Sequence, residues 1–592
     1  MKEFFKFTLA TITGIIVTSI IGFLFLMMVI GALIASTEKT VVVENQSMLV
    51  IKLDNQIVDR APNDPFSDLN IPGFGSAKKL GLDQIISSIE KAVDDDRIKC
   101  IYLDLSMVNG GMAAVEEIRN ALIAFKDSTD KPIYAYGDMF DQKAYYLATV
   151  ADRLVLNPQG AIDFRGLGGE ITFYKNALEK LGVEMQIVRH GKFKAAVEPL
   201  MLEKMSDENR EQTMVYLNSL WNQMLKGISE KRNIPVEKLN ELADDVLTFR
   251  RSEKALEAGL VDALKYKDEV LDELREITGI AQGKGIPVIG IANYAKAPAK
   301  KGKKSTFSRD KIAVIYASGD IGMAMMGSEG ISGDKLSREI RKVRQDSSFK
   351  AIVLRIDSPG GSAYDSEVIW REVKLAADTK PVVVSMGNVA ASGGYYIACA
   401  ANKIVAQPNT ITGSIGVFGT IPNAGELMNN KLGITTDVVK TNQHSDMPSL
   451  TRKMTDFERD LMQDYVENIY DVFLERVAEG RNMTKEAIDE IGQGRVWSGE
   501  NALEIGLVDE LGGLGRAIAL AAELSGLEEY RIVDLPALTD PFQEFLSGGS
   551  DNLRARFLKS ALGKSAKYYE IVERAGKMKG VYALLPYSIE IR

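Results

Sequence analysis

The chain of 592 residues repeats its own sequence once, at an interval of about 250 residues. Similarity at a fixed interval means that one structural unit occurs twice, which restricts the possible folds more than any local pattern does. The matching segments occur in the same order in both halves. They are ALEAGLVD (255–262) with ALEIGLVD (502–509), YYLATVADRLVLNP (145–158) with YYIACAANKIVAQP (395–408), IYLDLSMVNGG (101–111) with IVLRIDSPGGS (352–362), and Arg232-Asn233 with Arg481-Asn482.

The repeat limits predict five parts of the chain. The linker is rich in Lys, Ala and Pro, as exposed connectors are. The tail has no counterpart in the first repeat, and its basic, Tyr-containing stretch is compatible either with packing on a neighbour or with contact to lipid headgroups. The parts are a membrane anchor (1–38), the first repeat (46–294), the linker (295–310), the second repeat (311–538) and the C-terminal tail (539–592).

Short apolar segments alternate with amphipathic helical segments in both repeats. In the second repeat, KIAVIYA, AIVLRID and PVVVSMG have the composition of buried strands. Helical patterns of ten or more residues separate these three segments. Strands that alternate with helices of this length form parallel sheets. The fold class predicted from the residues is therefore α/β, with two tandem units.

The N-terminal segment has the properties of a transmembrane helix. No charged residue occurs from Phe7 to Thr37, and about 20 apolar residues cross a hydrocarbon core. The small residues of 32–36 leave a cleaved signal peptide open as the alternative. Lys2 and Lys6 precede the apolar run, which predicts a cytoplasmic N-terminus and an exported body.

Composition excludes several classes of function. The net charge of −9 argues against nucleic acid as the main partner, because a backbone binder needs a clustered basic surface. The two cysteines, Cys100 and Cys399, are predicted to be free and buried. Without a CxxC motif or a Cys/His cluster, neither a metal nor a cofactor is predicted.

Two Ser/Gly segments of the second repeat carry residues that suit catalysis. Ser392 stands between a strand and a helix, where a developing anion is favoured. Its neighbour Gly393, and Gly360 or Gly361 in Ser-Pro-Gly-Gly, offer backbone N–H groups for an oxyanion. Taken alone, a Ser-Gly-Gly sequence is as well explained by an ordinary helix N-cap.

These segments together resemble a known family. SPGGS, AASGGYYIACAANKIVAQPNTITGSIGV and HGKFKAAVEPL (190–200) are similar to the signature of the signal peptide peptidase A (SppA) family of membrane-bound Ser/Lys proteases. The resemblance implies two tandem crotonase-like (Clp protease-like) ββα repeat units behind one N-terminal transmembrane helix. It also implies a homotetramer.

The resemblance assigns a role to each matching residue. Ser392 takes the position of the nucleophile and Lys194 that of the general base. Ser414 matches a serine that orients the lysine amine, and Gly360, Gly361 and Gly393 match the oxyanion hole. The implied substrates are cleaved signal peptides and similar peptides, at the periplasmic side of a bacterial inner membrane.

The two repeats have lost complementary parts of this pair. Gln142 occupies the position of Ser392 in the first repeat, and a carboxamide is no nucleophile. The position of Lys194 in the second repeat falls on His444 or Ser445. One complete pair therefore requires both halves, within one chain or between two subunits.

Lysine acts as a base only if its pKa falls from about 10.4 toward neutrality, which burial achieves. Ala195–Val197 offer an apolar wall beside Lys194, while Lys192 is the rival candidate. A Ser-His-Asp triad would need His190 or His444. Two rival functions remain at this point. They are a crotonase-type acyl-CoA hydrolase or hydratase, with a carboxylate base, and an inactive membrane scaffold.

Overall fold

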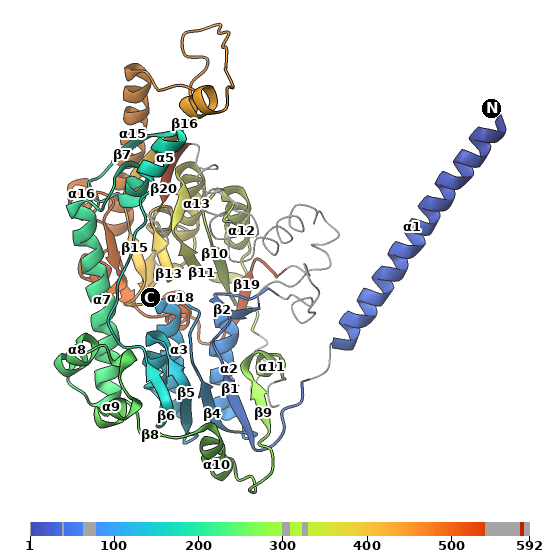
Figure 1. The fold of residues 1–592 in the computed structure, drawn as a ribbon, viewed down its shortest axis with the longest axis vertical. Helices are drawn as coiled ribbons and strands as arrows, with labels where there is room; N and C mark the ends of the chain where they lie inside the picture. Colours follow the sequence, from blue (N-terminus) through green and yellow to red (C-terminus); the bar gives the residue numbers. More distant parts are fainter. Residues whose placement is uncertain are drawn as a thin grey trace.

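A computed structural model describes residues 2–37, 41–62, 78–298, 308–322, 330–538 and 580–584. Two α/β bodies follow one another along the long axis of the molecule (Figure 1). Most elements of the first half, coloured blue to green, occupy one end, and most elements of the second half, yellow to orange, occupy the other, whereas α5 and β7 of the first half lie beside β16. The duplicated α/β architecture expected from the sequence is confirmed.

The first body contains a six-stranded parallel sheet in the order β8-β6-β5-β4-β1-β9. A short parallel pair, β2 with β3, lies outside it. Strand β7 leaves this body and joins a sheet of the second one. The strands are β1 (Ser47–Ile51), β2 (Gln56–Val58), β3 (Lys79–Gly81), β4 (Ile98–Asp104), β5 (Ile133–Phe140), β6 (Arg153–Ile162), β7 (Glu184–His190), β8 (Ala263–Leu264) and β9 (Val288–Gly290).

Helices cover both faces of the first sheet. One face meets α2, α3, α4, α7 and α8 in one apolar cluster, and the other meets α10 in a second cluster. The helices are α2 (Leu82–Asp94), α3 (Met112–Ser128), α4 (Gln142–Ala148), α5 (Lys175–Leu181), α6 (Glu198–Met201), α7 (Asp207–Arg232), α8 (Val236–Asp244), α9 (Ser252–Glu257), α10 (Lys267–Thr278) and α11 (Ile291–Lys296), with 3-10 turns η1 (Ala195–Val197) and η2 (Leu247–Phe249).

The second body repeats this plan. Its main sheet has the order β17-β15-β13-β11-β10-β19, with β14 paired to β13 and β18. All pairs are parallel except β15 with β17. The strands are β10 (Lys311–Ser318), β11 (Phe349–Ser358), β13 (Val382–Ala391), β14 (Lys403–Ala406), β15 (Ile411–Gly413), β17 (Val496–Ser498), β18 (Glu510–Leu511) and β19 (Arg531–Leu535).

The helices of the second body also lie on both faces of its sheet. One face meets α12 to α15 and the other meets α18, as the two apolar clusters show. Strands covered on both faces are apolar along their whole length, which explains the near-continuous apolar runs in the sequence. The helices are α12 (Gly333–Gln345), α13 (Ala363–Ala377), α14 (Gly393–Ala398), α15 (Asp456–Arg481), α16 (Lys485–Ile491), α17 (Gly499–Glu504) and α18 (Leu514–Ser525), with the π-helical turn η3 (Leu427–Lys431).

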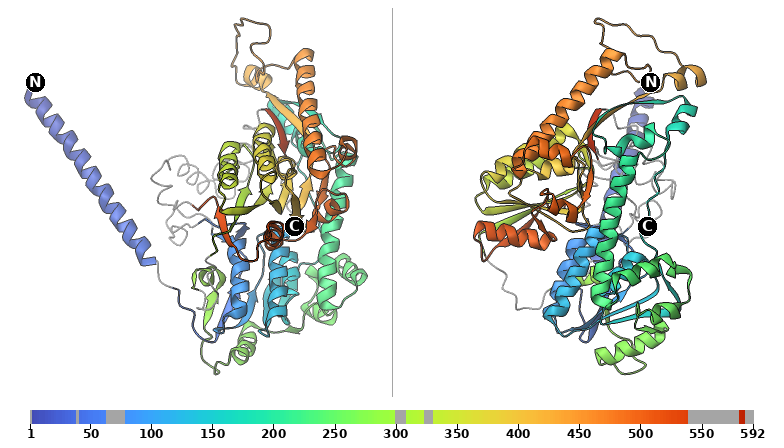
Figure 2. Two further views of the ribbon diagram at one scale, coloured as in Figure 1. Left: turned by 180° about the vertical axis from the view of Figure 1, so that it is seen from behind. Right: turned by 90° about the vertical axis from the view of Figure 1, so that its left-hand side faces the viewer.

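A four-stranded sheet joins segments that are far apart in the sequence. Its order is β12-β20-β16-β7, with β12 (Gly360–Ser362), β16 (Val417–Asn423) and β20 (Gly580–Leu584). All seven residues of β7 pair antiparallel with β16, which places a segment of the first repeat on the second repeat. The view from behind and the side view both show the long green helix α7 running from the first body along the second (Figure 2).

The predicted membrane anchor, linker and C-terminal tail are only partly covered by the described residues. Helix α1 (Lys2–Thr37) covers the expected anchor, but the side chains of much of its second half lie outside the described residues. Among the residues that are described, no helix is both long enough and apolar enough to cross a membrane. The predicted linker and tail lie mostly outside the described residues. Cys100 and Cys399 are free and buried, as predicted.

Candidate active site

Ser392 lies at the sharp turn between β13 and α14. Its backbone has φ +56° and ψ −115°, a region that costs a non-glycine residue about 1–3 kcal/mol and persists only where the surroundings hold it. Its amide donates to the Gly413 carbonyl over 2.8 Å. Buried strands and a buried helix on either side therefore fix the direction of its hydroxyl.

Lys194 reaches this turn from the first repeat. It follows β7, whose pairing with β16 carries the segment onto the second body. Its Nζ lies 2.8 Å from Ser392 Oγ, 3.0 Å from Ser414 Oγ and 3.0 Å from the Ser414 carbonyl oxygen. All three side chains are fully buried. The structure thus brings together three of the predicted residues, from both halves of one chain.

Burial changes the ionisation of Lys194. It lowers the pKa of the amine well below the ordinary lysine value, and among the described residues no carboxylate acts against this shift. A neutral amine accepts a proton, whereas an ammonium group cannot. Ser414 supplies the polar contacts that keep the buried amine hydrogen-bonded without adding a negative charge. The surroundings therefore favour the form of lysine that acts as a base.

A turn of the second repeat holds Lys194 against its partners. The Gln493 carbonyl accepts from the Phe193 amide over 2.9 Å, and the Gly494 amide donates to the Ile415 carbonyl over 2.7 Å. Gly494 has φ +81°, and a Cβ there would lie 2.6 Å from the N, Cα and Cβ atoms of Lys194. Only glycine fits this contact. The sequence pattern gave no sign of it, because residues 194 and 494 are distant in the chain.

A buried polar network supports the same segment from the other side. The Glu198 carboxylate, fully buried, accepts from Ser206 Oγ over 2.5 Å and from Asn209 Nδ2 over 2.8 Å. Gln212 donates to the Phe193 carbonyl over 3.0 Å and accepts from the Val496 amide over 3.1 Å. These residues hold the loop that carries Lys194.

The glycine-rich segment lies beside the serine turn, because Ser358 is in register with Ala390 of β13. Gly361 has φ +156°, and a Cβ there would lie 2.0 Å from the Ile321 carbonyl oxygen, so no other residue fits. The Gly360 amide donates to Ser358 Oγ over 3.2 Å. This amide is therefore already engaged within its own segment, and Gly361 is paired with Ala583 of β20.

A strand from the C-terminal tail lies next to these glycines. β20 pairs antiparallel with β12, with Gly361 opposite Ala583, and with β16 on its other side. Tyr582 is buried against Phe418 and Val197, three residues after Lys194. The space between β12 and β16 thus holds an extended segment of the chain itself, with the Tyr582 ring in an apolar cluster.

Neither histidine contacts Ser392 or Lys194 in the described part of the chain, and Lys192 points elsewhere. His190 lies against Glu467 and stacks on Tyr470 with ring centroids 3.8 Å apart. His444 stacks on Phe457. Lys192 is exposed, with its Nζ 5.2 Å from the centre of the Phe193 ring. The geometry supports neither the histidine base nor the Lys192 alternative.

In the first repeat, hydrogen bonds hold the side chain of Gln142, the residue at the position equivalent to Ser392. Gln142 Oε1 accepts from the backbone amides of Arg165 and Gly166, each over 3.1 Å, and its Nε2 donates to the Gly166 carbonyl over 3.0 Å. The carboxamide of Gln142 therefore stands where the second repeat has a serine, and it holds the backbone of residues 165 and 166 in place.

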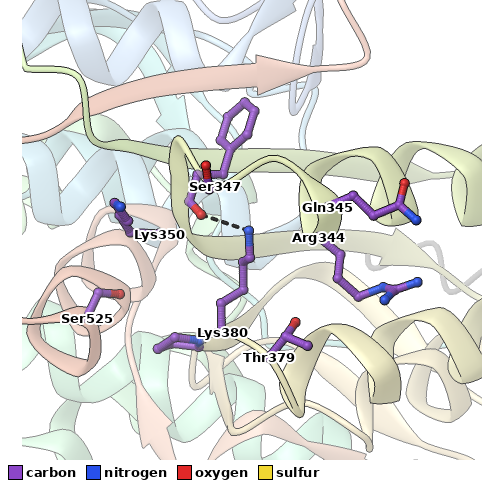
Figure 3. A pocket seen from close by; sticks show the side chains of 9 residues that line it. Arg344, Gln345, Ser347, Lys350, Thr379, Lys380 and Ser525 are labelled. Atoms are coloured by element: carbon purple, nitrogen blue, oxygen red, sulfur yellow. Dashed lines mark hydrogen bonds between the residues drawn. The ribbon is translucent and has the colours of Figure 1, made fainter.

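The second body also contains a cavity of about 430 Å³ that is not part of the site around Ser392 (Figure 3). It is lined by the end of α12 and the start of β11, and none of the predicted site residues contributes to it. Lys380 donates there to the carbonyls of Val343, Asp346 and Phe349. Lys131 of the first repeat likewise donates to three backbone carbonyls, those of Ala92, Val93 and Asp95. Because both repeats keep a lysine with backbone contacts of this kind, we assign it a structural role.

A serine hydroxyl paired with a buried lysine amine is the arrangement of serine hydrolases of the Ser/Lys type. Comparison with known proteins defines the family: the model of peptidase family S49 matches residues 125–281 and 374–528. The chain belongs to peptidase family S49 and is a serine protease. The double match also agrees with the sequence duplication. Family membership argues against the acyl-CoA alternative.

Curated relatives resemble the chain over most of its length. Protease 4 of Haemophilus influenzae is 34% identical over 85% of this chain and 83% of its own length. Protease 4 of Salmonella typhi is 37% identical over 84% and 82%. The chloroplastic serine protease SPPA of Arabidopsis thaliana is 35% identical over 86% and 74%.

Solved structures are more distant. ClpP1 of Listeria monocytogenes aligns with a TM-score of 0.22 at 16% identity over 34% of this chain and 91% of its own. The 1510-N membrane-bound stomatin-specific protease, as a point mutant in complex with a substrate peptide, aligns with a TM-score of 0.26 at 16% identity over 40% and 98%.

Proposed function

We propose that Ser392 is the nucleophile of this protease and Lys194 its general base. The observation that carries the proposal is the 2.8 Å contact between Lys194 Nζ and Ser392 Oγ, in a fully buried environment. The neutral amine takes the hydroxyl proton while Oγ attacks the peptide carbonyl. The resulting ammonium then gives that proton to the leaving amine, and an acyl-enzyme remains.

Deacylation uses the same two groups. Lys194 removes a proton from water, the hydroxide attacks the ester, and the proton returns to Ser392 Oγ as the acid product leaves. Ser414 orients the lysine amine through its two contacts of 3.0 Å. The Gly393 and Gly361 amides are the proposed oxyanion donors. The amide directly after a nucleophile serves this purpose in other hydrolases.

The proposed substrates are cleaved signal peptides and similar peptides. β20 supports a peptide substrate, because it lies as an extended strand between β12 and β16. Strand addition recognises any backbone, and pockets for alternate side chains add selectivity. The apolar side chains that pack on Tyr582 around Phe418 would suit the apolar side chains of leader peptides.

We also propose that residues 1–38 anchor the protein in the bacterial inner membrane, with the catalytic body on the periplasmic side. The charge-free run from Phe7 to Thr37 and the preceding lysines support this topology. The resemblance to the SppA family supports a homotetramer. The units 46–294 and 311–538 are the proposed structural repeats.

The test uses a serine-directed fluorophosphonate probe, followed by mass spectrometry of the labelled peptide. The label is expected on Ser392, at one site per chain. Ser392→Ala and Lys194→Ala should each abolish cleavage of a synthetic leader peptide, while far-UV circular dichroism stays unchanged. Lys192→Ala is the matched control and should retain activity. Full activity of either of the first two variants would show that the proposal is wrong.

A further inference from the structure

The strand that leads to Ser392 is irregular just before the catalytic turn. The register between β11 and β13 shifts between Ile356 and Ser358 of β11, so that residues 387–389 of β13 face the single residue Asp357. A bulge of this kind leaves backbone groups out of the ladder and bends the strand. The direction in which β13 enters the catalytic turn therefore depends on what holds the bulge.

The Asp357 carboxylate holds it. Its Oδ1 accepts from the Val389 amide over 2.9 Å, and its Oδ2 accepts from Asn388 Nδ2 over 3.2 Å. A Cβ on Gly387 would lie 3.0 Å from the Cβ atom of Asp357, so the side chain lies closely across the bulge. Both carboxylate oxygens are thus bound to β13 within a few residues of Ser392.

The same segment touches the other side of the catalytic turn. A Cβ on Gly394 would lie 2.7 Å from the carbonyl oxygen of Ser358, the residue after Asp357. Ser358 is fully buried, and its hydroxyl donates to the Gly319 carbonyl over 2.6 Å. Residues 357 and 358 therefore contact the chain both before and after Ser392.

The first repeat supports this contact through Asn388. Asn388 Oδ1 accepts from the Ala114 amide over 3.0 Å. Ala114 lies in the first turn of α3, whose N-cap residue, Gly111, offers no side-chain acceptor to the amides there. A Cβ on Gly111 would lie 2.2 Å from Asn388 Oδ1, so the glycine leaves the space that the carboxamide occupies. Asn388 therefore links Asp357 to the first body, and both ends of its carboxamide are fixed.

The first repeat ties its equivalent segments together in a different way. Asp141, at the position of Ala391, accepts from the Val108 amide over 3.0 Å and also caps α4. Ser106 stands at the position of Asp357, so this repeat has no carboxylate there. In the second repeat, the N-cap residue of α14 makes no side-chain cap. A carboxylate at 357 instead of 391 holds the turn from below and leaves the nucleophile without a capping neighbour.

We propose that Asp357 is a positioning residue for the nucleophile. Its carboxylate holds residues 388 and 389, so that Ser392 Oγ meets the Lys194 amine and the substrate carbonyl in one geometry. Asp357 acts through the Val389 amide and takes no part in proton transfer. This inference rests on the proposed role of Ser392.

The charge state of Asp357 suits this role. The ionised carboxyl group is a pure acceptor, which matches the two donors that face it. Burial, and then the negative charge of Asp59, raise the pKa of the Asp357 carboxyl to about 6, while its hydrogen bonds and the Arg355 guanidinium act against the shift. The group is therefore ionised at neutral pH.

The test exchanges the two polar groups of the contact. Asp357→Asn keeps one acceptor for the Val389 amide but turns an NH2 group against the NH2 group of Asn388. Because a misplacement of about 1 Å costs on the order of 10²-fold in rate, kcat for a leader peptide should fall by about 10- to 100-fold. KM should change little, since the peptide groove is untouched. Asn388→Asp places two carboxylates together and should lose kcat in the same way.

The double variant, Asp357→Asn with Asn388→Asp, restores every hydrogen bond. The new carboxamide donates to the new carboxylate, and the Val389 and Ala114 amides keep their acceptors. The carboxylate at 388 also meets the N-terminus of α3, where a negative charge is favoured. Its kcat should exceed that of either single variant about tenfold, which is the sign of two residues that act on each other.

Asp152→Asn is the matched control. Asp152 of the first repeat likewise accepts from the amide of a strand residue, Ile133, over 2.8 Å, and its variant should keep the wild-type kcat. Circular dichroism reports folding in all samples. If Asp357→Asn does not fold, the double variant decides, because it keeps the contact and should be folded and active. Wild-type kcat in Asp357→Asn, or a double variant that is unfolded or no faster than the single variants, would overturn the proposal.

The rate of fluorophosphonate labelling separates this proposal from that of the nucleophile. We expect Ser392 to be labelled more slowly in Asp357→Asn than in the wild type, and the double variant to regain the rate. Absence of label from Ser392 in the wild type would overturn the proposed function itself. Label on Ser392 at one rate in the wild type and in Asp357→Asn would overturn the positioning role alone.

Discussion

Gly494→Ala tests whether the turn at 493–495 holds Lys194 in place. The added Cβ would lie 2.6 Å from three atoms of Lys194, against an ordinary contact of about 3.4 Å. The Lys194 backbone must therefore move by about 0.8 Å, the difference between these values. A displacement of about 1 Å at a catalytic group costs on the order of 10²-fold in rate. We expect kcat/KM for a leader peptide to fall by about that factor.

The matched control is Gly283→Ala. Gly283 has φ +78°, similar to the +81° of Gly494, but no atom lies within 4 Å of its added Cβ. Both variants incur the same backbone strain of about 1–2 kcal/mol, and only one meets Lys194. The control should lose stability without losing rate.

The pH profile separates positioning from a general loss of stability. Activity requires the neutral amine, so kcat/KM should rise with pH and level off above the lowered pKa of Lys194. A lysine moved toward more polar surroundings regains a higher pKa, and the rising limb of Gly494→Ala should shift to higher pH. A variant with wild-type kcat/KM and an unshifted profile would refute the positioning role of Gly494.

Four other variants test the stability of the chain and the number of its reactive sites. Lys194→Met should raise the melting temperature at neutral pH by about 2–4 °C, since it removes a buried amine. The folded amine binds fewer protons than the unfolded one between the lowered pKa and about 10.4, so wild-type stability should rise with pH there and the variant should lose this slope. Arg355→Met leaves the buried carboxylates of Asp59 and Glu117 without their cation, so the free energy of unfolding in urea should fall by about 3–5 kcal/mol. Arg338→Ala breaks only the exposed pair with Asp334 and should change this free energy by less than about 1 kcal/mol. Gln142→Ser should leave probe labelling at one site per chain, on Ser392, because the second repeat has His444 or Ser445 in place of the lysine that a serine at position 142 would need.

The sequence predicts the parts of this site that depend on local pattern and on the repeat. Ser392 stands in a strand–turn–helix segment that is recognisable over a few residues. Lys194 is identified by its family motif, and its need for a partner in the other half follows from Gln142. Both residues, with Ser414, lie within hydrogen-bond contact. Their catalytic roles remain a proposal.

Contacts between distant segments were not predictable in the same way. The fit of Gly494 against Lys194 joins positions 300 residues apart. The placement of β20 beside β12 depends on pairing across more than 200 residues. Strands pair through backbone hydrogen bonds, which depend only weakly on the side chains. A single sequence therefore predicts that a strand is present more readily than it predicts which strand it pairs with.

The loop donated by the first repeat also determines how activity depends on concentration. Because β7 and Lys194 reach Ser392 within one polypeptide, the pair forms in a unimolecular step of folding. A single-repeat enzyme of the same design would need a second copy to supply its lysine, and its active fraction would fall on dilution. Duplication followed by complementary loss makes each folded chain carry one complete pair, at any expression level.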